Sequence, residues 1–270
     1  MGADLTRANL TDSILAGAEL QGATLAAARL ERADGRGAQL AGSNLQGAQL
    51  NRADFNTANF QRANLSQGEA LGVNFSGAQL QGANLTAANW RGAELQRANL
   101  DGAIAPNLIL AQAGGPFSSW RGANLQDADL RRAKLAIADF RQADLRGAQL
   151  TDAYLHGARF NQSDLSGTDL TRAILRTADL TEASLIGATL ARADLTLAQL
   201  VRANLTYSDL RETDFSGSNL AAANLSYARL QAAIFEAAYI TDMDLTAASI
   251  QDTDFKGAIR PLRPPQPPER

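Results

Sequence analysis

The sequence predicts an all-β solenoid in which four pentapeptides make each coil. A large apolar residue stands at nearly every fifth position from Leu5 to Phe255, and each of these positions is called here the centre of its repeat. The residue two positions before a centre is small, usually Ala. Neither the helical period of about 3.6 nor the strand period of about two fits a strict period of five. A chain that turns a corner every five residues would direct both positions inward, and its stacked coils would form one elongated body.

Aromatic residues set the length of the coil. Aromatic centres recur at intervals of twenty residues, as Phe55 and Phe75, as Trp120, Phe140 and Phe160, and as Phe215, Phe235 and Phe255. With four corners to a coil, these rings would stack in columns inside the body. Tyr207 and Tyr227 show the same interval at outward positions, so two independent sets of residues support a twenty-residue coil.

Glycine and proline mark the corners. Of the 22 glycines, 17 lie two positions after a centre, and Gly2 has the same phase. At this position a type II turn requires a positive φ that Gly adopts without strain. The seven prolines all lie outside the regular repeats, at Pro106, at Pro116 and within 261–268. We interpret this as exclusion, because coils that bond to one another through their backbone have no N–H group to spare.

The repeated phrase is A-(D/N/Q)-(L/F)-x-x, as in the stretches RGANL, QDADL and RGAQL. Its repetition in phase over nearly the whole chain resembles the pentapeptide-repeat family, and in particular its Ala-rich cyanobacterial members. The resemblance implies a right-handed quadrilateral parallel β-helix over residues 1–259. It also implies a cytoplasmic protein, and some members of the family are regulators that bind signalling proteins.

One coil length, residues 101–120, departs from the phrase. It reads DGAIA PNLIL AQAGG PFSSW, with two prolines and the pair Gly114-Gly115. The segment is either a distorted coil or a loop thrown out of the rod, and we favour the loop, which would expose Leu108, Ile109 and Phe117 to a partner. Gly35 and Ala70 are small centres that keep the phase, and we expect thin places in the core there.

The two ends of the repeat region differ. Residues 260–270 form a Pro-rich tail that we expect to be extended or disordered. The first coil begins at residue 3 without a covering segment, and an open coil presents unpaired backbone groups. Either more chain precedes it or it meets another molecule, so an end-to-end homodimer is one expected assembly.

Composition argues against catalysis and against several classes of partner. The net charge is −3, from 25 basic and 28 acidic residues, so we expect no direct contact with nucleic acid. Cys is absent and His156 is the single histidine, which leaves no nucleophile pair and no thiolate or paired-histidine metal site, and we expect neither enzyme activity nor a cofactor. No apolar run approaches the ~18 residues of a membrane span. The regularly spaced Asp and Asn residues before the centres are interpreted as side chains that bond the backbone.

Two outward sets of residues are candidate protein contacts. If the coil has twenty residues, one corner collects Arg91 and Arg211 together with the six strongest candidates, which are Arg32, Arg52, Arg131, Arg132, Arg172 and Arg192. Arginine suits bidentate contacts with carboxylates, although neighbouring acidic residues could neutralise the stripe, namely Asp34, Asp54, Asp194 and Asp214. The second set is apolar and comprises Ile186, Tyr207 and Tyr227, and aromatic anchors are common at interfaces.

The function predicted is a non-catalytic scaffold or regulator that binds an unidentified protein through the surface of a rigid rod. The alternative is the DNA-mimic subgroup of the resembled family, whose strongly acidic rods inhibit or protect DNA gyrase. Residues 1–100 carry 8 basic and 8 acidic residues, and residues 121–258 carry 14 and 18. This balance favours the scaffold, and the acidic stretch from Glu236 to Asp254 is the feature that favours the mimic.

Overall fold

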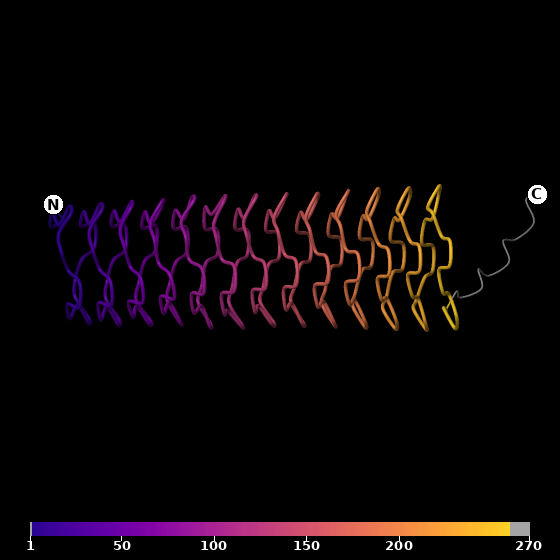
Figure 1. Cartoon of the computed structure of the whole chain (residues 1–270), viewed down its shortest axis with the longest axis horizontal. Coiled ribbons are helices and arrows are strands. Elements are labelled where there is room, and N and C mark those ends of the chain that lie inside the picture. The colour runs from indigo at the N-terminus through magenta and orange to yellow at the C-terminus, as the bar shows by residue number, and fades with distance from the viewer. Residues whose placement is uncertain (1, 260–270) are drawn as a thin grey trace, which may run out of the picture.

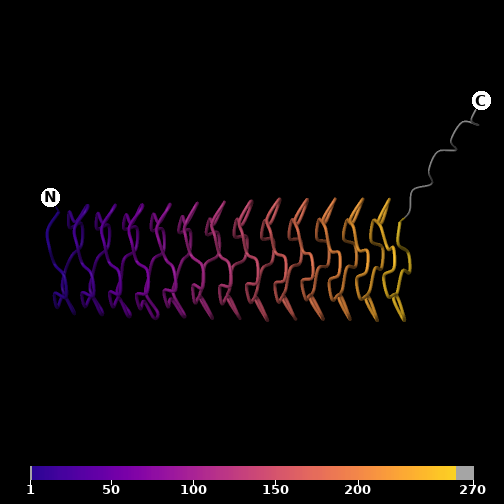
Figure 2. The ribbon, with the colours of Figure 1, turned by 90° about the horizontal axis from the view of Figure 1, so that it is seen from above.

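The computed structural model describes residues 2–259, which form a straight rod of stacked coils (Figures 1 and 2). Colour runs evenly along the axis from the first coil to the last, so each coil lies between the coils that precede and follow it in sequence. No helix occurs within these residues, and therefore none that could span a membrane. The strands are single parallel bridge residues, from Asp4 with Thr24 to Tyr239 with Ile259. Each bridge joins the residue before a centre to the residue twenty positions later.

Four of the five backbone N–H groups in a pentapeptide donate to backbone carbonyls. The two residues that follow a centre are called here the first and second corner residues. In residues 25–29, the N–H groups of the centre Leu25 and of the second corner residue Ala27 donate to carbonyls of the following coil at 2.6 and 2.8 Å. The N–H of Ala28 donates to the carbonyl of Leu25 at 3.0 Å and closes the turn, and the N–H of Arg29 donates to the preceding coil at 2.9 Å. The same pattern recurs along the rod. The first corner residue has no backbone acceptor in any described coil.

Where Asp or Asn precedes the centre, its side chain supplies that missing acceptor. The N–H of Ser66 donates to Asn64 Oδ1 at 3.1 Å, and the N–H of Thr86 donates to Asn84 Oδ1 at the same distance. A buried or half-buried donor without a partner is destabilising, so the preference for Asp and Asn has a direct cause. The interpretation of these residues as backbone-bonding side chains is confirmed.

The two prolines within residues 2–259 occupy the one position that can accept them. Pro106 and Pro116 are both first corner residues, and the residues two positions earlier are Ile104 and Gly114, which have no side-chain acceptor to offer. Proline also has the φ that the first central position of a type II turn requires. The prediction that regular coils exclude proline is therefore wrong for the first corner residue. Within residues 2–259 it holds for the other four positions of the pentapeptide, whose N–H groups donate to backbone carbonyls.

Residues 101–120 form a complete coil rather than a loop. The four bridge residues of this segment each pair with the coil before and the coil after, and they are Ile104, Ile109, Gly114 and Ser119. The predicted protrusion is wrong, and so is the exposure of Leu108, which is fully buried. Ile109 is half-buried, while Phe117 does lie at the surface.

The coil stays regular because its interior side chains exchange sizes. Ala105 is a small centre, and the next small position holds Leu108, so one large side chain has moved three positions along the chain. At the next corner the indole Nε1 of Trp120 donates to Ser118 Oγ at 2.9 Å, and that hydroxyl donates to the carbonyl of Gly115 at 2.7 Å. Total volume, rather than the identity at each position, is what a close-packed core requires.

Gly35 shows the same compensation between coils. A Cβ at Gly35 would lie 2.1 Å from Cε1 of Phe55, so the ring of the next coil already fills the space that a Leu centre would occupy. The thin place expected there is absent. Ala70 is likewise fully buried.

Aromatic columns confirm the twenty-residue coil. The ring centroids of Phe215 and Phe235 lie 4.8 Å apart, those of Phe235 and Phe255 lie 5.0 Å apart, and all three rings are close to parallel. Phe140 and Phe160 stack in the same way at 5.0 Å. These spacings match the distance of about 4.8 Å between neighbouring strands.

Every second corner residue from Arg7 to Gly257 has a positive φ, and 34 of these 51 residues are not glycine. The prediction of positive φ at this position is confirmed, but glycine accounts for only 17 of the corners. The exceptions include the β-branched Ile137, at a φ of 58°, where a side chain of this type is strained.

Replacing Ile137 with Gly is expected to raise the free energy of unfolding by about 1 kcal/mol, because the left-handed region costs a non-glycine residue roughly 1–2 kcal/mol and some apolar contact is lost. Urea unfolding followed by circular dichroism measures the change. The reverse substitution, Gly157→Ile in the next coil of the same column, should lower stability. Equal stability of all three chains would show that these corners are unstrained.

Candidate interaction surfaces

The predicted arginines lie along one edge of the rod, called here the arginine edge. It consists of the corner pairs 11–12, 31–32 and their equivalents at intervals of twenty, because coils bridge at that interval. Five of the six arginines are second corner residues and Arg131 is a first corner residue. The structure therefore brings all six onto one edge.

Most of the arginine edge is neutralised by its own acidic residues. Arg172 binds Asp152 through two hydrogen bonds of 2.7 and 2.8 Å, and Arg192 binds Glu212 at 2.9 and 3.1 Å. Asp12 pairs with Arg32 in the same way. The acidic residues that the sequence suggested as neutralisers lie on the next face instead, where Asp34, Asp54 and Asp194 pair with other arginines. The edge therefore does not form a continuous basic stripe.

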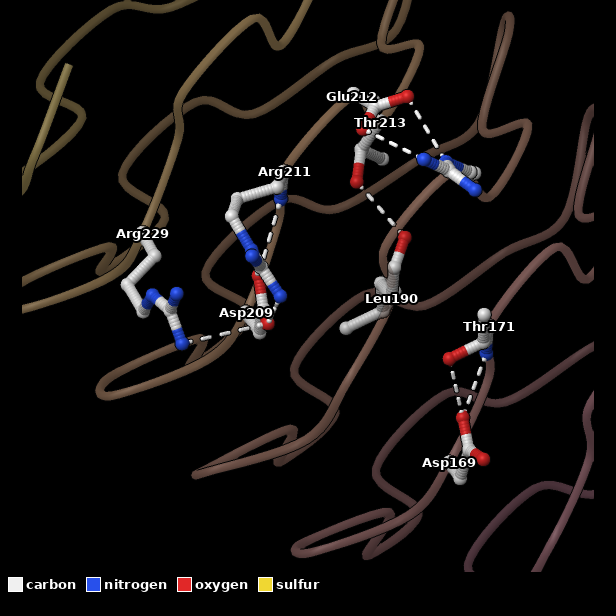
Figure 3. A network of polar contacts seen from close by, with 9 residues as sticks. Asp169, Thr171, Leu190, Asp209, Arg211, Glu212, Thr213 and Arg229 are labelled. Carbon is white, nitrogen blue, oxygen red and sulfur yellow. Dashed lines mark hydrogen bonds and ion pairs between the residues drawn. The ribbon is translucent and has the colours of Figure 1, made fainter. Parts of the chain in front are cut away.

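Figure 3 shows basic and acidic side chains that alternate beside this edge in the C-terminal half of the rod. The Nε and Nη2 groups of Arg211 donate hydrogen bonds of 2.8 and 2.7 Å to the carboxylate of Asp209. Arg229 of the next coil lies 3.6 Å from the same carboxylate. Exposed pairs of this kind contribute little to stability, about 0–1 kcal/mol each. Their effect on the surface is to cancel charge locally.

The edge is hollowed where it crosses the coil 101–120. A recess of about 460 Å³, called here the basic hollow, opens there. It is lined by Arg91, Ala111, Gln112, Arg131, Arg132, Gln149, Thr151, Asp152, Asp169 and Arg172. Arg132 lies 3.8 Å from Asp152, a carboxylate that already binds Arg172, and Arg91 has no ion pair among the residues that the structure describes. The residues that line the basic hollow include four arginines and two aspartates.

A second recess, called here the apolar hollow, lies on the adjoining face and has a volume of about 410 Å³. It is lined by Glu94, Gln112, Gly114, Pro116, Lys134, Ala136 and Tyr154. Gln112 lines both hollows, so they meet at the corner of this coil. Gly114 keeps the recess open, since a Cβ there would lie 2.7 Å from a carboxylate oxygen of Glu94.

Exposed apolar side chains gather beside the apolar hollow. Phe117 and Ile137 are equivalent residues of successive coils and are 50% and 46% exposed, and Tyr154 and Ile174 are equivalent residues on the adjoining face. We call these four residues the apolar cluster. The guanidinium of Arg97 lies 5.9 Å from the centre of the Phe117 ring. Of the four, sequence reasoning found only Phe117; the signal it missed was the twenty-residue spacing of apolar residues at outward positions.

The predicted apolar set on another corner is also at the surface. Tyr207 and Tyr227 stack with ring centroids 4.9 Å apart, and Tyr207 is 62% exposed. Ile186 is exposed one coil earlier. This set lies two corners away from Phe117 and Ile137, so the molecule presents two separate apolar surfaces.

The described residues offer little for chemistry. They contain no group of three or more His, Asp or Glu side chains placed to hold a metal ion. His156 lies on the outside, its ring 6.2 Å from that of Tyr154. The hydrogen bonds from Arg146 hold the pKa of Asp144 down at about 2, against burial, and Gln126 adds a further hydrogen bond.

Acid is expected to weaken the fold through Asp144 and similar carboxylates. Because the pKa of Asp144 is lowered on folding, its contribution is present above its ordinary value of 3.8 and is lost as the pH falls towards about 2. Asp129, Asp139 and Asp209 have pKa values lowered by hydrogen bonds from arginine as well. Urea titrations across this interval should show falling stability, with a smaller fall in Asp144→Asn. An identical pH profile for the two chains would contradict the assignment.

The fold and the repeat together define a solenoid built from pentapeptides. The family model described as pentapeptide repeats matches residues 3–34, 36–68, 71–106, 123–162, 158–196, 198–236 and 223–259. The chain therefore belongs to the pentapeptide-repeat family, and the predicted right-handed quadrilateral β-helix is confirmed. The matches leave out residues 107–122, within a coil whose backbone is nevertheless regular.

Solved structures include several relatives. HetL, a pentapeptide repeat protein involved in heterocyst differentiation regulation in the cyanobacterium Nostoc sp. strain PCC 7120, is 34% identical, with a TM-score of 0.58, over 78% of this chain and 92% of HetL. A pentapeptide repeat protein from the Arabidopsis thaliana thylakoid lumen is 33% identical over 38% of this chain and 66% of its own, with a TM-score of 0.28. QnrB1, a plasmid-mediated fluoroquinolone resistance protein, is 19% identical over 79% and 82%, with a TM-score of 0.35. No curated protein matches this chain.

Proposed function

We propose that this protein is a non-catalytic rod that binds another protein through its outward side chains and acts as a scaffold or regulator. The observation that carries the proposal is the apolar cluster. Phe117 and Ile137 are about half exposed and stand next to Tyr154 and Ile174 on the adjoining face. Exposure of these side chains does not stabilise the rod, and clustered exposed apolar groups mark interaction sites.

The similarity to HetL, a protein involved in regulation, supports a regulatory role. A DNA mimic would need an extended acidic surface, whereas the arginine edge alternates basic and acidic groups at close range. The scaffold is therefore the better supported function. A second copy of the chain remains an alternative occupant of the surface, and light scattering of the purified protein distinguishes a monomer from a dimer.

Site-specific photocrosslinking tests the proposal, because the chain has no Cys of its own. A benzophenone maleimide attached to Gln112→Cys would lie at the hollows, and one attached to Thr177→Cys would lie near the apolar cluster. The matched control is the same label on Gln67→Cys, which is also an exposed second corner residue. In an extract of the source cells, we expect a crosslinked partner of defined mass at one of the first two positions and none at the control. Equal crosslinking at all three positions, or none at any, would contradict the proposal.

A further inference from the structure

The coil 101–120 forms a furrow at one corner of the rod because two of its outward residues, Ala111 and Gly114, are small. Ala111 lies between the long side chains of Arg91 and Arg131 in the coils on either side, and Gly114 lies between Glu94 and Lys134. The walls are therefore two coil spacings apart, or about 10 Å, a width that suits one extended chain. Gln112 lines both hollows, so the hollow on the arginine edge and the hollow on the adjoining face are neighbours at this corner.

One half of the furrow is short of negative charge. Arg131 and Arg172 are paired with Asp129 and Asp152, and the carboxylate of Asp169 accepts hydrogen bonds from threonine hydroxyls. Arg91 forms no ion pair within the described residues, and Arg132 approaches only the carboxylate of Asp152, which Arg172 already binds. Guanidinium groups bind carboxylates in a planar, two-pronged geometry, so an acidic ligand fits this half.

The other half offers an apolar floor. Pro116, Ala136 and Tyr154 line it, and Phe117 and Ile137 stand exposed beside it. Glu94, which reaches over Gly114, and Lys134 line this hollow with opposite charges, so the hollow has no excess of positive charge to attract a carboxylate. Large apolar anchors in such recesses carry much of the affinity of protein interfaces.

We propose that the two hollows together form a single groove for an extended acidic segment of a partner protein, with its carboxylates over the basic hollow and one aromatic side chain in the apolar hollow. The proposal rests on the protein-binding function proposed above and adds the site and the chemistry of the partner. Charge complementarity selects this occupant over a basic or neutral segment.

A bimane fluorophore on Gln112→Cys reports binding, because a nearby tryptophan quenches it. The probe is the peptide acetyl-Glu-Asp-Glu-Trp-Glu-Asp-Glu-amide. One control peptide has Lys in place of every acidic residue. A second control keeps the acidic residues and has Ala in place of Trp, and its binding is measured by its ability to displace the first peptide. Added to the full chain at low salt, the first peptide should quench saturably and lose affinity as salt is raised. The same fluorophore on Gln67→Cys should be unaffected.

Two variants locate the groove. The pair Arg91→Glu and Arg132→Glu should lower the affinity at least about tenfold, whereas Arg52→Glu with Arg62→Glu, the same change of charge at two exposed arginines outside the hollows, should leave it nearly unchanged. Gly114→Gln should also weaken binding by filling the furrow without changing charge. Circular dichroism confirms that each variant is folded.

The groove is overturned if the basic peptide binds as well as the acidic one, if the Ala form competes equally, or if no saturation occurs below about 1 mM. It is also overturned if both pairs of substitutions have the same effect. Failure of the peptide together with continued photocrosslinking through Thr177→Cys would remove this groove and leave the protein-binding function standing.

Discussion

Replacing Phe235 with Arg is expected to unfold the C-terminal coils of the rod. Phe235 is fully buried and stacks on the rings of Phe215 and Phe255 in the coils on either side. A buried guanidinium would lack both water and a carboxylate, and removing the ring alone costs about 3–5 kcal/mol. Because each coil contacts only its neighbours, the loss should be local to this end.

Limited proteolysis with mass spectrometry measures this local loss. In Phe235→Arg, cleavage should begin in the last few coils while a fragment containing the earlier coils persists. Phe235→Leu is the matched control, since Leu is the commonest centre in this chain, and it should resist protease nearly as well as the native protein. A Phe235→Arg chain as resistant as the control would mean that the column of rings is not an interior one.

Proline placed at the two residues of one corner should have opposite effects. Ala27 has a φ of 53° and donates its N–H to Gln46 at 2.8 Å, so Ala27→Pro loses a ladder hydrogen bond and imposes an incompatible φ. We expect a loss of about 3 kcal/mol or more. Ala26→Pro affects an N–H that has no acceptor in the structure, and it should be neutral or stabilising by up to about 1 kcal/mol.

Urea unfolding of the two proline variants, followed by circular dichroism, compares them within a single turn. The natural residues Pro106 and Pro116 occupy the position of Ala26, not of Ala27, which is why the order of stability is expected to follow the hydrogen-bond pattern. If Ala26→Pro were the more damaging change, the account of how the corners satisfy their N–H groups would be wrong.

The period of the sequence was sufficient to predict the core and the corners. Leu at the centres and Ala two positions earlier could only point inward, and the spacing of Phe215, Phe235 and Phe255 set the coil length. The segment 101–120 was misjudged because its interior volume is conserved over a whole coil rather than at each position. Ala105 and Leu108 look like errors in the repeat when read one at a time, but together they fill the same space.

The surface was less predictable than the core. Alignment of the arginines on one edge followed from the period, but their charge depends on which carboxylate each side chain reaches, and Arg172 finds Asp152 exactly one coil away. The hollows arise because Ala111 and Gly114 have shorter side chains than the equivalent residues of the neighbouring coils. A small residue in the sequence does not indicate a recess until the residues beside it in the fold are known. Phe117 was identified for a different reason, as part of a loop that does not form.

Residues 101–120 form one complete coil in register with the rest of the rod. Thermal unfolding of two deletion variants, followed by circular dichroism, tests this register most directly. Removing 101–120 takes out a whole coil and joins Leu100 to Arg121 in phase, so this variant should unfold cooperatively at a temperature close to that of the native chain. Removing 104–117 breaks the twenty-residue phase and should lower that temperature sharply. The opposite order, with the shorter deletion tolerated and the longer one damaging, would show that the segment is a loop.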